Sequence, residues 1–167
     1  GELHAAEFRF DLFEKPQYII MFDKPVFFAH STFLKSVDFD YVHFKEDASF
    51  AFTNFEGSAK FDYASFNRQA SFFGTRFEDY LFFTSVIFNG PASFNDATFN
   101  CLPVFQLISF NDVVEFDRSN FNEGFGISSS TFKNEAKFTS VNINGDSGFK
   151  NNKFEKKVSF DSVTFNG

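Results

Sequence analysis

The chain offers few side chains that could perform catalysis or hold a metal. Covalent catalysis needs a nucleophile held beside a base, and a structural zinc site needs four clustered Cys or His ligands. The chain has three histidines, all before residue 44, and one cysteine: His4, His30, His43 and Cys101. Its Asp and Glu residues occur singly apart from two adjacent pairs. The sequence therefore predicts no enzyme, no cofactor and no metal site.

Charge is the feature that bears on a binding partner. The formal net charge is −7. Residues 77–135 carry eight acids and two bases, whereas residues 136–167 carry three acids and five bases. An acidic chain repels the phosphates of nucleic acids, so direct binding to DNA or RNA is not expected. We expect the partner to be another protein.

The apolar pattern bears on the cellular compartment. No apolar stretch approaches the roughly 18 residues that a membrane helix needs, and no hydrophobic signal segment opens the chain. The chain begins with Gly instead of Met, which indicates a trimmed N-terminus. We expect no membrane segment in this chain and a cytoplasmic location.

Phenylalanine recurs with a strict period, so we expect it to build the fold that positions any functional side chains. The chain contains 33 Phe and no Trp. From Phe28 to Phe165 a large apolar residue recurs at steps that alternate between five and six. Of these 26 central positions, 24 are Phe and two are Ile127 and Ile143. The core column that we expect comprises Phe50, Phe55, Phe61, Phe66, Phe72, Phe77, Phe83, Phe88, Phe94, Phe99, Phe105, Phe110, Phe116 and Phe121.

The alternating steps distinguish strands from helices. An 11-residue period also fits a right-handed helical supercoil. In a helix, however, a step of five turns the side chain by about 140°, so successive Phe residues would face apart. In a strand, residues i and i−2 face the same side, and the residue two before each central position is mostly Ala, Val, Ser or Thr. The sequence predicts short strands joined by turns and wound into a solenoid.

The repeat of a small residue, any residue, a central Phe and two polar or turn residues resembles the pentapeptide-repeat family in its Phe-centred form. The resemblance covers residues 22–167. It implies an all-β, right-handed quadrilateral β-helix with four short faces per coil. The alternating five- and six-residue steps predict about 6.5 coils of 22 residues, with the extra residue of every second repeat at a corner.

The resemblance leaves two functions open. The favoured interpretation is a non-enzymatic structural or protein-interaction module. The alternative is a DNA mimic, because some family members bind bacterial type II topoisomerases such as gyrase and protect them from quinolones. Mimicry needs an acidic column along the rod, which Asp40 and Asp62 begin. The same column continues with Thr84, Gln106, Ser128 and Lys150, which disfavours mimicry.

Asparagine columns and aromatic residues outside the central positions are the candidate surface features. Asparagines recur 22 residues apart in two series, which predicts side-chain ladders at two corners; Asn also tolerates left-handed turn geometry. The series are Asn67, Asn89 and Asn111, and Asn100, Asn122, Asn144 and Asn166. Phe73 and Phe82 adjoin central Phe residues, so alternation points them outward. With Phe52 and Phe125 they form a candidate exposed aromatic patch.

The two ends of the repeat need covering, because an open solenoid exposes strand edges. Residues 1–21 lack the repeat. The spacing of Leu3, Ala6, Phe10 and Phe13 predicts a short helical cap, and an edge strand is the alternative. The last central residue, Phe165, is followed by two residues only. We expect either a homodimer through the C-terminal coil or the loss of a natural continuation.

Overall fold

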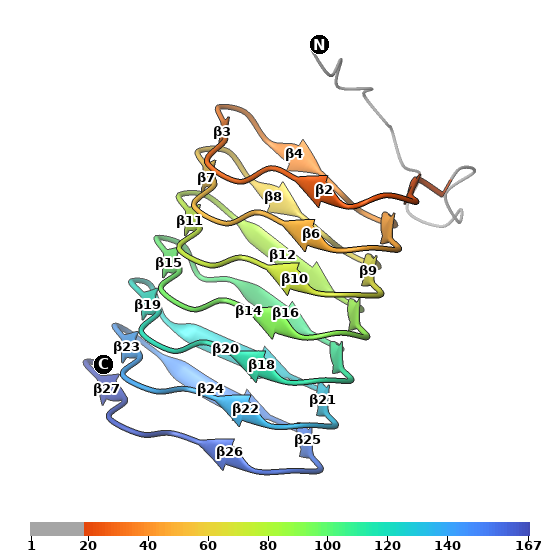
Figure 1. The fold of residues 1–167 in the computed structure, drawn as a ribbon. Helices are drawn as coiled ribbons and strands as arrows, with labels where there is room; N and C mark the ends of the chain where they lie inside the picture. Colours follow the sequence, from red (N-terminus) through yellow and green to blue (C-terminus); the bar gives the residue numbers. More distant parts are fainter. Residues whose placement is uncertain (1–18) are drawn as a thin grey trace.

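The computed structural model describes residues 19–167, and each regular element in that range is a short β-strand. The strands wind into a four-sided solenoid (Figure 1). In that view β2 (Val26–Phe27) crosses the front, β3 (Thr32–Phe33) lies at the left and β4 (Val37–Asp38) crosses the rear as the chain descends. This winding is right-handed. The predicted all-β, right-handed quadrilateral β-helix is confirmed, whereas the predicted cap lies outside the described residues except for 19–21.

Four parallel sheets, named A to D here, form the four sides. Sheet A contains β1 (Met21–Phe22), β5 (His43–Phe44), β9 (Ser65–Phe66), β13 (Ile87–Phe88), β17 (Ser109–Phe110), β21 (Thr131–Phe132) and β25 (Lys153–Phe154). Sheet B contains β2, β6 (Ala48–Ser49), β10 (Ala70–Ser71), β14 (Ala92–Ser93), β18 (Val114–Glu115), β22 (Ala136–Lys137) and β26 (Val158–Ser159).

The other two sides are built in the same way. Sheet C contains β3, β7 (Asn54–Phe55), β11 (Arg76–Phe77), β15 (Thr98–Phe99), β19 (Asn120–Phe121), β23 (Asn142–Ile143) and β27 (Thr164–Phe165). Sheet D contains β4, β8 (Ala59–Lys60), β12 (Leu81–Thr84), β16 (Val104–Gln106), β20 (Phe125–Ser128) and β24 (Ser147–Lys150). The 27 described strands make just under seven turns.

Register fixes the length of a turn at 22 residues. Phe77 of β11 pairs with Phe55 above and Phe99 below. Backbone hydrogen bonds join successive turns, as where the Phe94 N–H donates to the Glu115 carbonyl at 2.7 Å. Each residue therefore lies over its counterpart 22 positions away, and the outer surface consists of columns parallel to the rod axis.

The central Phe side chains form the core. All fourteen that the sequence singled out are at most 2% exposed. Along the rod they stack with parallel planes: the ring centroids of Phe72 and Phe94 lie 4.9 Å apart, and the angle between the ring planes is 2°. Within one turn they meet edge to face, as do Phe61 and Phe72 at 5.5 Å and 90°. Both are favoured arrangements for aromatic rings, so four Phe per turn fill the interior without a large void.

The corners are of two kinds, and the difference explains the alternating steps. Five-residue steps follow sheets B and D and contain a tight turn, in which the Ala97 N–H donates to the Phe94 carbonyl at 3.2 Å. Asp96, inside that turn, has φ +57°, as the third residue of a type II turn requires. Six-residue steps follow sheets A and C, so the extra residue lies at those corners, as expected.

The turn at β20 (Phe125–Ser128) departs from the rule of a central Phe preceded by a small residue. On β20 the large side chain of Phe125 occupies the position two before the centre, and Ile127 occupies the centre. Both are buried, and the Phe125 ring packs 4.6 Å from that of Phe121. The expectation that Phe125 belongs to an exposed patch is wrong, because residues i and i−2 share the inner side of a strand.

Candidate interaction surface

The predicted asparagine series form continuous side-chain ladders. At the corner after sheet A, the Asn111 amide donates to Asn89 at 2.8 Å, and Asn89 donates to Asn67 at 3.1 Å. At the corner after sheet C, Asn122 donates to Asn100 at 2.6 Å. Asn144 and Asn166 continue that second series at 3.3 and 2.9 Å. These amides bind one another, so their geometry accounts for a structural role along the rod.

The left-handed turns lie elsewhere than expected. Among residues 19–167, twelve non-glycine residues have φ between +52° and +60°, and none of them belongs to the two asparagine series. Among them are Tyr41, Phe52 and Arg118, whose types do not favour this conformation. The five-residue step imposes the turn, so residue type is a poor guide to it.

The column that begins with Asp40 and Asp62 also binds the backbone. An Asp40 carboxylate oxygen accepts from the Asp62 N–H, and an Asp62 oxygen accepts from the Thr84 N–H, both at 2.7 Å. Burial, and next the negative charge of Asp38, raise the pKa of Asp40 to about 7. Asp40 is therefore a weaker source of negative charge near neutral pH than an exposed carboxylate. The sequence did not indicate this second kind of ladder.

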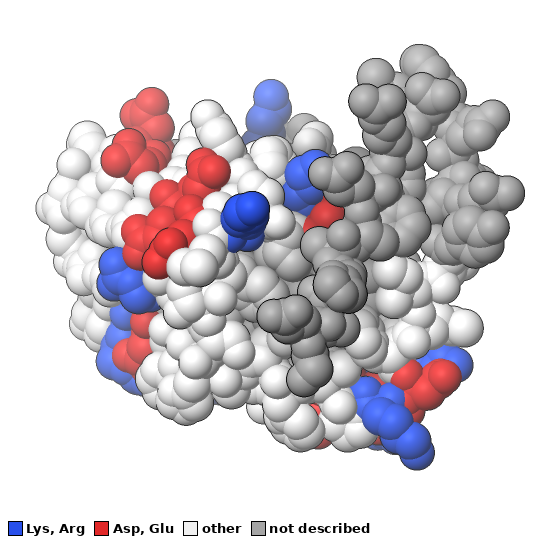
Figure 2. Space-filling view, turned by 90° about the horizontal axis from the view of Figure 1, so that it is seen from above, with Lys and Arg blue, Asp and Glu red and all other residues white. Residues whose placement is uncertain are grey.

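A minority of the charged side chains on the rod form ion pairs. The five ion pairs of the described residues are Lys45–Asp23, Arg76–Glu78, Arg118–Asp96, Lys137–Glu115 and Lys153–Glu155. Figure 2 shows one mainly acidic group and other groups of mixed sign, separated by wide uncharged areas. A hydrogen bond from Asn100, and next the pairing with Arg76, hold the pKa of Glu78 below its usual range.

The predicted aromatic residues do not gather at one place. Phe73 lies at the corner after sheet B, half-buried, with its ring edge-to-face against exposed Phe52 at 5.2 Å. Phe82 lies on sheet D, also half-buried, with its ring 6.2 Å from that of Tyr80. Phe73 and Phe82 therefore belong to different sides of the solenoid.

Sheet D carries apolar side chains on its outer surface in two neighbouring columns. Tyr80 and Leu102, one turn apart at the corner before the sheet, are 63% and 55% exposed. Phe82 and Val104 are register partners on β12 and β16 and are half-buried. Tyr80 was not singled out from the sequence. The sequence does contain a signal for it: Tyr80 lies 22 residues before Leu102, so the two occupy the same column when the sequence is written in rows of 22.

Toward the last turns, the surface along these two columns is hollowed, because glycines replace the larger side chains. Gly126 and Gly148 are register partners on β20 and β24, and a Cβ on either would meet nothing within 4 Å. The hollow has a volume of about 350 Å³ and extends from Leu102 to Gly148. An apolar patch that continues into a groove is a feature of protein-binding surfaces.

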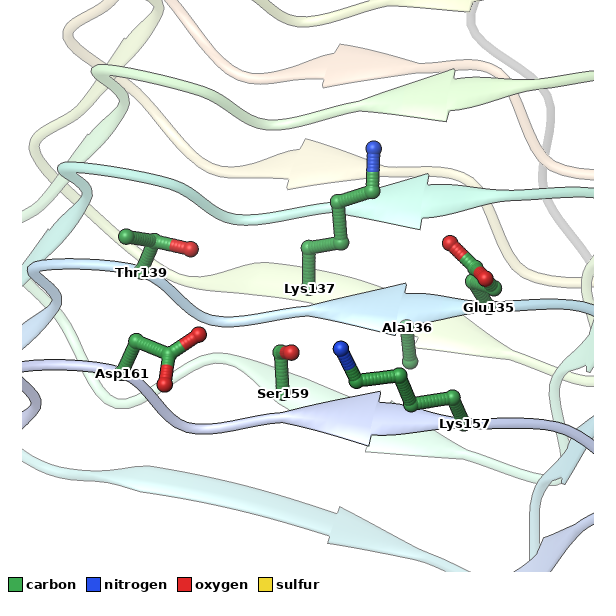
Figure 3. Close-up of a pocket in the computed structure, with 7 residues that line it drawn as sticks. All are labelled: Glu135, Ala136, Lys137, Thr139, Lys157, Ser159 and Asp161. Atoms are coloured by element: carbon green, nitrogen blue, oxygen red, sulfur yellow. The ribbon is translucent and has the colours of Figure 1, made fainter.

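Sheet B carries a smaller, polar groove of about 230 Å³ (Figure 3). Ser159 lies at its middle, with Thr139 and Asp161 toward one end and Lys157 toward the other. Lys137 points away from Asp161 and donates to Glu115 at 2.8 Å. The remaining lining side chains are small or solvent-exposed, so this groove offers a partner little apolar area.

The histidine and cysteine side chains form no recognisable catalytic set among residues 19–167. The Ser65 hydroxyl lies 3.0 Å from Nδ1 of His43, but no carboxylate in that range hydrogen-bonds to His43, so the third member of a triad is lacking. Burial raises the pKa of Cys101 to about 11, which keeps its thiol protonated. No cluster of three or more potential metal ligands occurs in the described part.

This fold, with its columns of outward side chains, defines a repeat protein of the β-solenoid class. The family model for pentapeptide repeats (9 copies) matches residues 20–65 and 53–98, and the same 22-residue register continues to β27. The chain belongs to the pentapeptide-repeat family. No curated protein and no solved structure matches it. Within residues 19–167 the structure has no helix with the length and apolar character needed to cross a membrane.

Proposed function

We propose that this protein is a non-enzymatic interaction module that binds another protein through the outer surface of sheet D. The observation that carries the proposal is the exposed apolar pair of Tyr80 and Leu102 beside a groove on the same sheet. Tyrosine is enriched among the residues that contribute most to binding when a partner removes them from water. Leu102 adds apolar area beside Tyr80. As a compartment for this interaction we propose the cytoplasm.

Rigidity supports the proposal. The side chains of sheet D project from strands that are hydrogen-bonded above and below and packed on stacked Phe rings. A surface held in this way loses little conformational freedom on binding, which favours affinity.

Affinity capture from a lysate of the source cells tests the proposal. We expect the wild-type chain to retain a partner that Leu102→Ser loses. The matched control is Ile87→Ser, because Ile87 is an exposed apolar residue on sheet A, 42% exposed. Equal retention by both variants, or retention lost equally by both, would contradict a site on sheet D.

A second candidate is binding to a type II topoisomerase by DNA mimicry, as in some relatives. One observation favours it: acids recur at the corner between sheets C and D, at Glu56, Glu78, Asp79, Glu123 and Asp146. The pairing of Glu78 with Arg76 weakens this series. A gyrase supercoiling assay decides: inhibition at micromolar protein supports mimicry, and its absence leaves the interaction module. Duplex DNA itself should not bind, because the acidic rod repels phosphate.

We propose that the C-terminal coil forms a homodimer. Phe160 and Phe165 are 47% and 56% exposed there. Size-exclusion chromatography with light scattering measures the mass directly: twice the chain mass supports the homodimer, and a single chain mass contradicts it.

A further inference from the structure

The groove on sheet D has an apolar end and an acidic edge. Leu102 forms the apolar end, and Gly126 and Gly148 leave its floor open down to the strands. Glu123 and Asp146, from two successive turns, line the edge that faces sheet C. The groove therefore combines a place for an apolar side chain with two carboxylates.

The two carboxylates are available to a ligand. In the described part of the chain, the side chains of Glu123 and Asp146 form no ion pair and no hydrogen bond, and both residues are exposed. This differs from Glu78 and Glu115, which are paired with Arg76 and Lys137.

Lys150 lies at the opposite end of β24 from Asp146. It ends β24, two residues beyond Gly148, at the corner that leads to sheet A. A cation in the groove is therefore drawn toward Glu123 and Asp146 and away from Lys150. Charge complementarity gives the occupant an orientation across the sheet.

We propose that the groove accepts an extended segment of a partner protein in which a Lys or Arg lies beside an apolar residue. The cation lies between Glu123 and Asp146, and the apolar side chain packs on Leu102 and Tyr80. The aliphatic stem of Lys or Arg covers the glycine floor, where no side chain of this protein reaches. This inference rests on the proposed interaction surface and names the chemistry of its partner.

A labelled peptide is the probe. Fluorescence anisotropy of the full chain is measured with a fluorescein-labelled heptapeptide that carries one Lys between Leu and Val residues. Two matched peptides replace that Lys with norleucine or with Glu. We expect the Lys peptide to bind most tightly, and added salt to weaken it more than the norleucine peptide.

Three variants locate the binding. Glu123→Gln and Asp146→Asn should each weaken binding of the Lys peptide by up to about fivefold, the upper end of the range for an exposed ion pair, and leave binding of the norleucine peptide unchanged. Gly126→Val fills the groove and should abolish binding of all peptides. Its position has open space outside, so it should fold, and Ser93→Val on sheet B is the matched control.

The outcomes separate this inference from the proposed function. Equal binding of the Lys, norleucine and Glu peptides, or no effect of Glu123→Gln and Asp146→Asn, overturns the basic segment. Loss of binding in Gly126→Val alone would then still support an interaction surface on sheet D. Absence of binding by every peptide also overturns the inference, while the Leu102→Ser capture experiment independently decides the proposed function.

Discussion

Replacing one ring in the middle of the rod tests what holds the coils together. Phe94 is fully buried, with the rings of Phe72 and Phe116 stacked on it at 4.9 and 4.8 Å. The rings of Phe83 and Phe105 meet it edge to face at 5.8 and 5.9 Å. Phe94→Ala therefore removes contacts on both faces and two sides of one ring.

The expected cost follows from this burial. Truncating a buried Phe to Ala costs about 3–5 kcal/mol, because apolar area is lost and a cavity remains. In a chain of this length, each kcal/mol lowers Tm by about 2–4 °C, so the shift should be about 6–20 °C. Ser93→Ala changes the neighbouring outward side chain and should stay within about 0.5 kcal/mol.

The loss of stability should be smaller for a central Phe near the end of the rod than for one in the middle. Phe160 is 47% exposed and stacks on one ring, Phe138, at 5.1 Å. Phe160→Ala should cost about half as much as Phe94→Ala, because it removes about half of the buried contact. Thermal and urea unfolding followed by far-UV circular dichroism measure all three. Equal midpoints for Phe94→Ala and Ser93→Ala would refute the assignment of inner and outer positions.

Three further predictions concern ladders, glycines and pH. Asn122→Ala should cost about 1 kcal/mol in urea unfolding, because two ladder hydrogen bonds are lost; no change would show that the ladder is passive. Gly57→Ala should lower Tm, since its Cβ would overlap the backbone nitrogen of Ser36, while Gly126→Ala should not; equal Tm values would contradict this packing. Asp40 binds its proton more tightly in the folded chain, so stability should fall as pH rises from about 3.8 to about 7 and remain lowered above. Asp40→Asn should then unfold at higher urea than the wild type above pH 7 and at the same urea near pH 3.8, and parallel pH profiles would exclude this role.

The inner half of the structure could be predicted from the sequence because one residue type recurs at fixed steps. Phe50 to Phe121 are buried as their spacing predicts. The burial of Phe125 was not predicted, because on β20 the large aromatic side chain lies two residues before the central position and the smaller Ile127 occupies the centre. The strained turns at Tyr41 and Phe52 could not be predicted from residue type, because the five-residue step sets their φ angles.

The outer half was harder to predict, because it depends on which columns lie side by side. The asparagine ladders were visible as residues 22 apart. The groove was not visible in this way, because it depends on two neighbouring columns. In one column Gly126 and Gly148 follow Val104, and Leu102 lies in the other. The chemistry of a partner is encoded in the partner's own sequence, so the repeat alone could indicate only where to look.

Site-specific photo-crosslinking tests the proposed interaction surface most directly. The photoreactive residue p-benzoylphenylalanine is placed at Val104, on the outer side of sheet D, or at Ser93, on the outer side of sheet B. We expect illumination in a lysate of the source cells to yield a discrete protein adduct from position 104 and none from position 93. Adducts of equal yield from both positions, or from position 93 alone, would contradict it.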